Sequence, residues 1–351
     1  MARQNGFDSI RLLAALLVIF SHAFLLTSGN YDDEWVHMAT GGQTTLGSVA
    51  VGAFFVISGL FITASFDRSV SRADFVRKRA LRIMPALVVV ISLTVFVLGP
   101  LLTTLPLDAY FGNRETWTYL GHMVFLPVTA FLPGVFEGNT LPTVNESIWT
   151  LKYEVICYAI TFFTMMLARR ARVIVLAGWI ASFLIVRFWP NADFVSGFEY
   201  YIVATARMFR FFGTGMLLYL FRDRVMISPR LAWACLAITV AGTQTPVFLE
   251  ICAVFGGYAL IVFGFLAPAA FRQLAKRGDW SYGVYVYGWP VQQVTALFID
   301  AARDNAYVNS AISLVCALVL GWLSWTLVEH PALRFKPRRS SPSAGQQAAP
   351  E

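Results

Sequence analysis

Stretches of about twenty consecutive apolar residues recur along the chain, and no other feature restricts its fold as strongly. A helix of twenty residues is about 30 Å long, which matches the hydrocarbon core of a lipid bilayer. Of the 351 residues, 57% are hydrophobic and only 13% are charged. Soluble domains contain roughly 25% charged residues. The sequence therefore predicts an all-α, polytopic membrane protein.

Ten of these stretches are long enough to be transmembrane helices. They cover residues 9–28, 46–66, 84–103, 146–168, 173–190, 201–221, 231–248, 250–268, 282–299 and 310–328. Segment 117–136 is also apolar, but Pro127 and Pro133 interrupt it, and counting it would reverse the topology of the second half. We expect it to be a re-entrant or interfacial element on the outer face, with an eleventh span as the alternative.

Arginine and lysine residues are concentrated in alternate connections between these stretches. Residues 67–83 and 169–172 are rich in them, whereas residues 29–45 and 191–200 contain none. Because connections rich in arginine and lysine stay in the cytoplasm, this alternation predicts that both termini are cytoplasmic. The net charge of +7 then follows from topology and does not indicate nucleic-acid binding.

The ends of the chain carry two further signals. An apolar run follows Arg3, as in a signal peptide, but no A-x-A-like cleavage site follows it, so we expect it to remain as the first span. Residues 337–351 have the composition of a disordered cytoplasmic tail. The cysteines show no metal-ligand spacing and no disulfide framework, and we expect them to pack among apolar side chains; they are Cys157, Cys235, Cys252 and Cys316.

Arg11 and His22 enclose an apolar run in the first predicted span. Eleven helical steps are three turns plus about 20°, so both residues lie on one face, about 16 Å apart along the axis. An ionisable group inside a span is a functional candidate, and a neutral imidazole can accept a proton or attack a carbonyl. Two structural alternatives remain: Arg11 as an anchor at the headgroups, and His22 as a hydrogen-bond partner of a neighbouring helix.

Basic side chains cluster in residues 77–82, at the cytoplasmic approach to the third span. Arg79 and Arg82 are three residues apart, so they project together from a helix and could bind one phosphate group. A soluble donor that carries several phosphates would suit this cluster. The structural alternative is a positive loop that binds lipid headgroups.

Lys152 and Glu154 lie below the outer surface in the fourth span. Their i, i+2 spacing places them on different helix faces, so they do not form a mutual salt bridge. We expect Glu154 to lie in the outer half of the membrane with His22, where its carboxylate could orient the imidazole. A helix-packing hydrogen bond is the alternative for Glu154.

Other polar residues inside spans carry weaker signals. Gly59, after Ser58, is typical of close helix packing. Arg207 and Arg210 require an anionic ligand or an acidic partner.

The last two spans contain an aromatic stripe and an acidic residue. Tyr282, Tyr285 and Trp289 recur at helical spacing, which is typical of an aromatic belt at the membrane interface. Glu329 is interpreted as a cap of the last span.

The order of these segments resembles membrane-bound acyltransferase family 3. The resemblance is carried by the Arg11–His22 spacing and by the segments FFVISGLFIT, FVRKRALRIMP, SIWTLKYEVICY, SYGVYVYGWP and WTLVEHP, and it covers roughly residues 7–336. This family consists of ten-helix enzymes that O-acylate polysaccharides, lipopolysaccharide and related glycans in bacteria. The resemblance implies an integral-membrane acyltransferase domain over residues 1–336, in the bacterial cytoplasmic (inner) membrane.

The resemblance also implies the substrates and the site residues. The donor is acyl-CoA from the cytoplasm, as a substrate rather than a permanently bound cofactor. The acceptor is a hydroxyl of an extracytoplasmic glycan or lipid-linked glycan. His22 is then the catalytic residue with support from Glu154, and Arg11, Arg79 and Arg82 belong to the donor site. Membrane lipids are the other expected partner; neither a metal site nor a nucleic-acid partner is expected.

The sequence departs from the family pattern at one position. Many relatives have Tyr-x-x-His-Trp-Pro in the ninth span, whereas Gly288 precedes Trp289 here, so no role of that histidine can be transferred. Some relatives also carry an added hydrolase-like domain that is not visible here, so we expect either direct transfer or hand-off to a separate protein.

A transporter or flippase of an anionic lipid-linked glycan is the alternative function. Lys152, Arg207 and Arg210 would then line a polar path through the spans. Such a transporter does not require the Arg11–His22 spacing or the Arg79–Arg82 pair.

Overall fold

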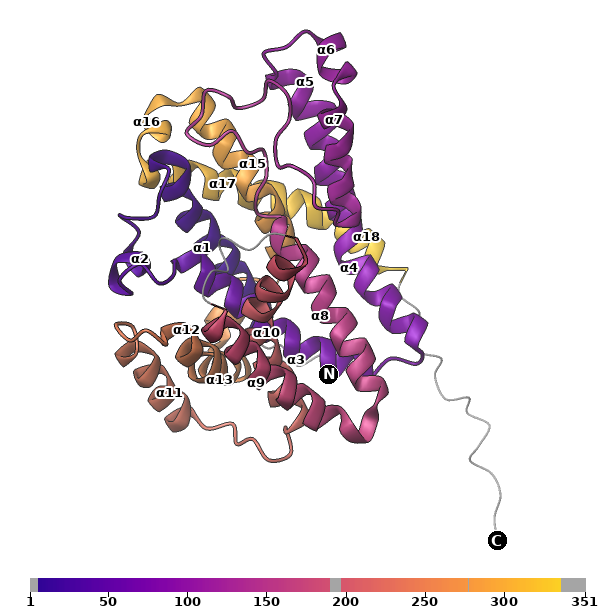
Figure 1. The fold of residues 1–351 in the computed structure, drawn as a ribbon, viewed down its shortest axis with the longest axis vertical. Coiled ribbons are helices and arrows are strands. Elements are labelled where there is room, and N and C mark those ends of the chain that lie inside the picture. Colours follow the sequence, from indigo (N-terminus) through magenta and orange to yellow (C-terminus); the bar gives the residue numbers. More distant parts are fainter. Residues whose placement is uncertain (1–5, 190–196, 277, 336–351) are drawn as a thin grey trace.

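The computed structural model describes residues 6–189, 197–276 and 278–335. Within these residues every regular element is helical (Figure 1), which confirms the all-α prediction. The tail at 337–351, which we predict to be disordered, lies outside the described residues.

Each predicted span coincides with a helix or with consecutive helical segments. In chain order these are α1 (Phe7–Ser28), α3 (Leu46–Asp67), α4 (Arg72–Leu93) with η1 (Thr94–Leu98) and α5 (Gly99–Leu102), α8 (Trp149–Met166), α9 (Ala171–Phe188), α10 (Phe198–Leu220), α11 (Pro229–Ala241), α12 (Phe248–Ile251) with η4 (Cys252–Gly256) and α13 (Gly257–Leu266), α15 (Ser281–Phe298), and α17 (Ala306–Ser324) with η5 (Trp325–Glu329) and α18 (His330–Leu333). The connections contain α2 (Trp35–Ala39), α6 (Leu107–Gly112), α7 (Arg114–Thr118), η2 (Tyr119–Val124), η3 (Ala168–Arg170), α14 (Ala269–Arg272) and α16 (Asp300–Arg303).

Among the described residues, 6 helical stretches are long and apolar enough to cross a membrane. They are Phe7–Ser28, Leu46–Asp67, Arg72–Leu102, Ala168–Phe188, Phe248–Leu266 and Ala306–Leu333. The remaining predicted spans form shorter or more polar helices. The count of ten spans and the cytoplasmic termini therefore stay predictions.

Segment 117–136 does not form a long helix. Helix α7 ends at Thr118, η2 is a short 3₁₀ segment that ends at Val124, and irregular backbone follows. Phe125 adopts a left-handed conformation, with φ of 62°. This confirms that Pro127 and Pro133 lie in a segment without a regular helix, while its position relative to the bilayer stays a prediction.

Helices α1, α3, α10, α15 and α17 form the packed centre of the molecule. Helix α1 packs against α3, α15 and α17, and α3 packs closely along α10. A Cβ atom on Gly59 of α3 would lie 1.9 Å from the backbone oxygen of Phe212, and one on Gly215 of α10 would lie 2.0 Å from that of Val56. These contacts confirm that Gly59 permits close helix packing.

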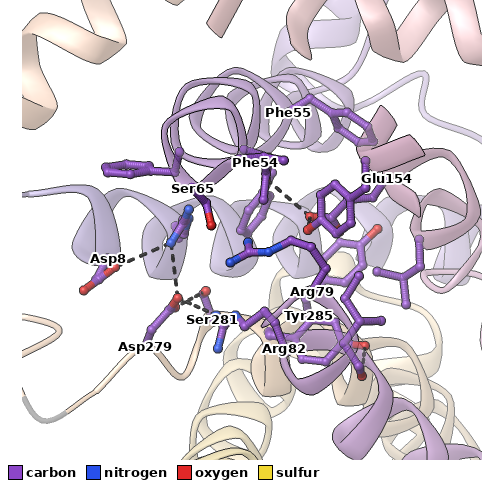
Figure 2. Close-up of a pocket in the computed structure, with 18 of the residues that line it drawn as sticks. Asp8, Phe54, Phe55, Ser65, Arg79, Arg82, Glu154, Asp279, Ser281 and Tyr285 are labelled. Atoms are coloured by element: carbon purple, nitrogen blue, oxygen red, sulfur yellow. Dashed lines mark hydrogen bonds and ion pairs between the residues drawn. The ribbon is translucent and has the colours of Figure 1, made fainter. Parts of the chain in front are cut away.

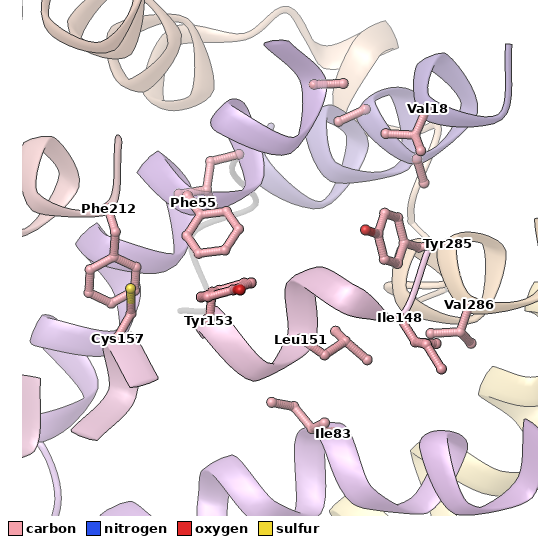
Figure 3. Packing of buried hydrophobic residues seen from close by; sticks show 14 of the residues in the cluster. Val18, Phe55, Ile83, Ile148, Leu151, Tyr153, Cys157, Phe212, Tyr285 and Val286 are labelled. Carbon is pink, nitrogen blue, oxygen red and sulfur yellow. The ribbon is translucent and has the colours of Figure 1, made fainter. Parts of the chain in front are cut away.

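Helix α4 runs along one flank of this bundle (Figure 1). The hydroxyl of Ser71 accepts a hydrogen bond from the Asp74 amide at 3.1 Å, and Asp74 pairs with Lys78 at 2.5 Å. This cap begins the helix upstream of the basic cluster, so the cluster is helical as predicted. Farther along, Ile83 of α4 and Leu151 of α8 point toward each other (Figure 3), and both are buried.

The cysteines are all free, and three of them are buried. Cys157, Cys235 and Cys252 pack inside the protein, whereas Cys316 is exposed. The expectation of packing is confirmed for the three buried residues.

Candidate active site

A cavity of about 610 Å³ lies between α1, α3, α4, α8 and α15 (Figure 2). This volume is in the range of small-molecule sites, roughly 300–1,000 Å³. Basic side chains outnumber acidic ones in its lining. The basic residues are Arg11, Arg68, Arg79, Arg82, Arg272 and Lys276, and the acidic residues are Asp8, Glu154 and Asp279. The cavity is therefore suited to an anionic ligand.

Asp279 is the carboxylate around which two of these arginines meet, and the sequence reasoning missed it. Its Oδ2 atom accepts from Arg82 and lies 3.4 Å from Nη1 of Arg11, and its Oδ1 accepts from the Ser281 hydroxyl. Burial alone would raise the pKa of Asp279, but Arg82 and then Arg11 outweigh this effect and hold the pKa below its ordinary value. The available signal was an acidic residue in a connection otherwise rich in basic ones.

Glu329 is the second acidic partner of Arg82. Its Oε2 lies 3.3 Å from Nη1 of Arg82, its Oε1 accepts from Ser324 at 3.0 Å, and only 2% of Glu329 is exposed. The π-helical segment η5 carries both Glu329 and Trp325, and Trp325 lines the cavity. The interpretation of Glu329 as a simple cap is therefore wrong, because it neutralises a buried arginine.

Arg79 lies in the same cavity but has different partners. Its guanidinium is 5.9 Å from the centre of the Tyr158 ring, and it makes no ion pair with any of the described residues. Its Nε atom is buried and lacks a hydrogen-bond partner among those residues. Arg79 and Arg82 do project together as predicted, but Arg82 is neutralised by carboxylates and Arg79 is not.

Glu154 lines the cavity with the arginines and does not contact His22. Its Oε1 atom accepts hydrogen bonds from Tyr158 at 2.5 Å and from Ser58 at 3.3 Å. The expected pairing of Glu154 with His22 is therefore wrong in this structure. The reason is rotational, because Glu154 and Tyr158 are one turn apart on the face of α8 that borders the cavity.

His22 lies outside the cavity lining, on the same helix as Arg11. Its ring packs against Trp289 of α15 in T-shaped geometry, with ring centroids 4.9 Å apart. No hydrogen bond joins its imidazole to any residue that the structure describes. The structure thus gathers Arg11, Arg79, Arg82 and Glu154 in one cavity and leaves His22 outside the lining of that cavity.

Two of the residues invoked for a transport path, Arg210 and Lys152, have partners inside the protein. Nη1 of Arg210 lies 3.3 Å from Oε1 of Glu250, which is the acidic partner that this arginine requires. Lys152 lies 5.3 Å from the Tyr201 ring centre and lines a different pocket from Glu154. The prediction that Lys152 and Glu154 face different sides is confirmed.

The aromatic stripe of α15 is buried in the protein. Tyr285 is 7% exposed and Trp289 is 2% exposed. Tyr282 donates to the backbone oxygen of Ile83 at 3.0 Å, and Tyr285 and Thr150 share a hydrogen bond of 2.7 Å. The interpretation as an interfacial belt is therefore wrong, since the stripe packs α15 against α4 and α8.

Comparison with known proteins decides the family. A family model described as an acyltransferase domain matches residues 4–328. The chain belongs to acyltransferase family 3. As an acyltransferase, it is an enzyme that transfers groups other than aminoacyl groups, and its apolar helices make it a membrane protein.

Curated relatives are similar over most of their lengths. An O-acetyl transferase of Shigella phage Sf6 is 32% identical over 97% of this acyltransferase and 98% of the relative. Nodulation protein 10 of Rhizobium leguminosarum bv. viciae is 28% identical over 95% of this chain and 94% of the relative. Exopolysaccharide production protein ExoZ of Rhizobium meliloti (strain 1021) is 26% identical over 84% of this chain and 92% of the relative. No solved structure matches the chain.

Family membership favours an enzyme over a transporter. The ion pair between Arg210 and Glu250 agrees with this, because it neutralises one residue of the proposed transport path. In this acyltransferase Gly288 packs against Ile19, since an added Cβ would lie 2.7 Å from its Cγ1 atom. A side chain such as the histidine found here in many relatives would not fit without a shift of Ile19.

Proposed function

We propose that this acyltransferase moves an acyl group from cytoplasmic acyl-CoA to a hydroxyl of an extracytoplasmic polysaccharide or lipid-linked glycan. The acyl group that we propose is acetyl. The observation that carries the proposal is Arg79, a guanidinium without a carboxylate partner among the described residues, in a cavity of about 610 Å³ with mostly basic charge. A ligand with phosphate groups would supply the missing negative charge.

In the proposed donor complex, Arg79 binds a phosphate of CoA directly. Arg82 and Arg11 are positioned by Asp279, and the excess of basic over acidic side chains in the lining gives the cavity a positive potential. The location of Arg79 and Arg82 at the basic, predicted cytoplasmic end of α4 supports a donor that enters from the cytoplasm. The same charge pattern supports placement in the bacterial cytoplasmic (inner) membrane.

His22 is the proposed general base for the acceptor hydroxyl. The hydroxyl oxygen attacks the thioester carbonyl, its proton passes to the imidazole, the acyl C–S bond breaks, and the CoA thiolate takes the proton from the imidazolium. Tyr285 lines the cavity, and Trp289, which contacts His22, is one helical turn farther along α15, or about 6 Å. The thioester end of the donor must therefore extend past Tyr285 toward Trp289.

Glu154 has a positioning role in this proposal. Its carboxylate holds the Tyr158 hydroxyl, and the Tyr158 ring lies beside the Arg79 guanidinium. Glu154 therefore supports the catalytic centre through the donor site and not by orienting His22.

The relatives support the class of acceptor. One is named an O-acetyl transferase and another an exopolysaccharide production protein. A polysaccharide hydroxyl is an acceptor that agrees with both names.

The test uses purified protein in detergent, radiolabelled acetyl-CoA, and the surface polysaccharide of the producing strain after its esters have been removed with mild alkali. We expect label to appear in the polysaccharide and to be released again by alkali, as an ester would be. The matched control is His22→Gln, which keeps a hydrogen-bonding side chain but cannot carry a proton. Wild-type protein that moves a lipid-linked glycan across vesicles without incorporating label would contradict the proposal and favour a flippase.

A further inference from the structure

A second, separate crevice of about 390 Å³ has no role in the donor site described above. Its lining comes from the beginning of α8 and the residues just before it, from the irregular segment 125–130, and from Tyr200 of α10. The polar groups in its lining include Asn145, Glu146, Lys152 and His122. The crevice thus combines hydrogen-bond donors and acceptors with aromatic rings.

The crevice and the donor cavity meet at one side chain. Leu151 of α8 lines both, and it is 3% exposed. On α4, Ile83 lines the donor cavity, whereas Leu87, one turn farther from the basic cluster, lines the crevice. The crevice is therefore displaced along α4 away from the predicted cytoplasmic end, as a second substrate site of a transmembrane transfer must be.

The crevice is also connected to the surroundings of His22. The indole N–H of Trp289, whose ring contacts His22, donates to the backbone oxygen of Thr143 at 3.1 Å. Asn145 in the crevice lining is two residues beyond Thr143, so their Cα atoms are at most about 7.6 Å apart. One short backbone segment therefore links the crevice to the contact surface of the proposed base.

Aromatic rings lie beside the ammonium group in the crevice lining. The Lys152 ammonium lies 5.4 Å from the Tyr153 ring centre and 5.3 Å from that of Tyr201, which restricts its position. Trp149 packs against Tyr153 in T-shaped geometry and remains 41% exposed. An exposed indole next to a carboxylate and an ammonium suits a pyranose, whose C–H face stacks on an aromatic ring and whose adjacent hydroxyls both donate and accept.

We propose that this crevice binds one sugar unit of the acceptor glycan, with the ring on Trp149 and its hydroxyls on Glu146 and Lys152. This inference rests on the proposed function, because it places the acceptor of that reaction. A lipid headgroup could use the same groups, since tryptophan and lysine also mark membrane interfaces. The sugar is favoured because Glu146 lies within the same lining and would repel a headgroup phosphate.

The experiment measures binding without any donor, so that it does not depend on transfer. The protein is placed in phosphatidylcholine nanodiscs and titrated calorimetrically with an oligosaccharide of two or three repeating units, cut from the alkali-treated polysaccharide of the producing strain. We expect Trp149→Ala to weaken the oligosaccharide Kd at least tenfold and Glu146→Gln and Lys152→Met to weaken it several-fold. The Kd for acyl-CoA should not change in any of them. Trp233→Ala is the matched control, because Trp233 on α11 is 70% exposed and lies outside the crevice.

The outcomes separate this inference from the proposed function. Weakened oligosaccharide binding in the crevice variants supports the sugar site even if no label is transferred. If all three variants are as thermally stable as the wild type and their oligosaccharide Kd is unchanged, the sugar site is overturned. Label transfer by the wild-type protein would still support the proposed function in that case. A loss in Trp149→Ala that Trp233→Ala shares would show an effect that is not specific to the crevice and would overturn the sugar site. Substitution effects confined to nanodiscs with phosphatidylglycerol would assign the crevice to lipid and also overturn it. If Trp149→Ala does not fold, the oligosaccharide Kd of the nearly isosteric Glu146→Gln variant decides whether the sugar site stands.

Discussion

Arg11 of α1 and Arg82 of α4 bind the same oxygen atom, Oδ2 of Asp279. The side chains of both arginines are about one-fifth exposed, and that of Asp279 is 12% exposed. One carboxylate therefore joins the predicted cytoplasmic ends of α1 and α4 to the connection that leads into α15.

Removing that carboxylate should destabilise the protein. Asp279→Asn leaves two guanidinium groups partly buried without their shared counter-charge, and breaking such a pair costs about 3–5 kcal/mol. We expect a clearly lower Tm in detergent. Asp300→Asn is the control, because Asp300 is 91% exposed in its pair with Arg303 and should leave Tm unchanged. Equal Tm values for the two variants would show that Asp279 does not hold the helices together.

The same carboxylate should give a defined pH dependence. Because the folded-state pKa of Asp279 is lowered below its ordinary value of 3.8, its contribution to stability is complete above that value and is lost as the pH falls through the folded-state pKa. The difference in Tm between wild type and Asp279→Asn should therefore shrink as the pH falls below about pH 4. A difference that stays undiminished below that pH would contradict this assignment.

Substitutions of Arg79 and of Arg82 should have different effects, one on the donor KM and the other on Tm. Arg79→Gln removes the proposed contact to the donor but no protein ion pair. We therefore expect the KM for acyl-CoA to rise roughly ten- to a hundredfold, which corresponds to about 1.5–3 kcal/mol, with little change in Tm. Arg82→Gln leaves Glu329 without its arginine and Asp279 with Arg11 alone, so it should lower Tm. The KM for the glycan serves as the internal control. An unchanged donor KM in Arg79→Gln would leave the basic cluster as a topology signal only.

His22 tests the catalytic assignment. General base catalysis contributes about 10²–10⁴-fold, so His22→Ala and His22→Gln should both lose glycan acylation by at least that lower factor. Membrane levels and Tm of the Gln variant establish that it is folded. If His22 only packs against Trp289, the Gln variant should keep most of its activity, and recovery of more than about half would refute the catalytic role.

Topology is tested with a reporter that is active only outside the cytoplasm. Fusion after Asp33, in a connection without arginine or lysine, should give activity. Fusion after Arg170, in a connection rich in arginine, should give none. Activity of a fusion at the C-terminal tail would contradict the ten-span map.

The sequence by itself determined the helices and the basic cluster. Apolar stretches of membrane length predict helices wherever they occur, since the backbone has no other way to satisfy its hydrogen bonds in lipid. The common projection of Arg79 and Arg82 also follows from local geometry, because residues three apart on a helix are neighbours. The interruption of 117–136 could also be predicted locally, because its two prolines cannot continue a regular helix.

Only the tertiary structure decided which side chains meet. Asp279 is separated from Arg82 by 197 positions in the chain, and no local pattern joins them. Helices such as α1 and α3 are apolar around most of their circumference, so their hydrophobic pattern does not indicate which face packs inside. For that reason the rotation of α8, which brings Glu154 to Ser58 of α3, and the burial of Trp289 against His22 could not be predicted. Helix–helix packing sets these rotations, through close contacts such as that of Gly59 with Phe212, and packing is a property of the whole chain.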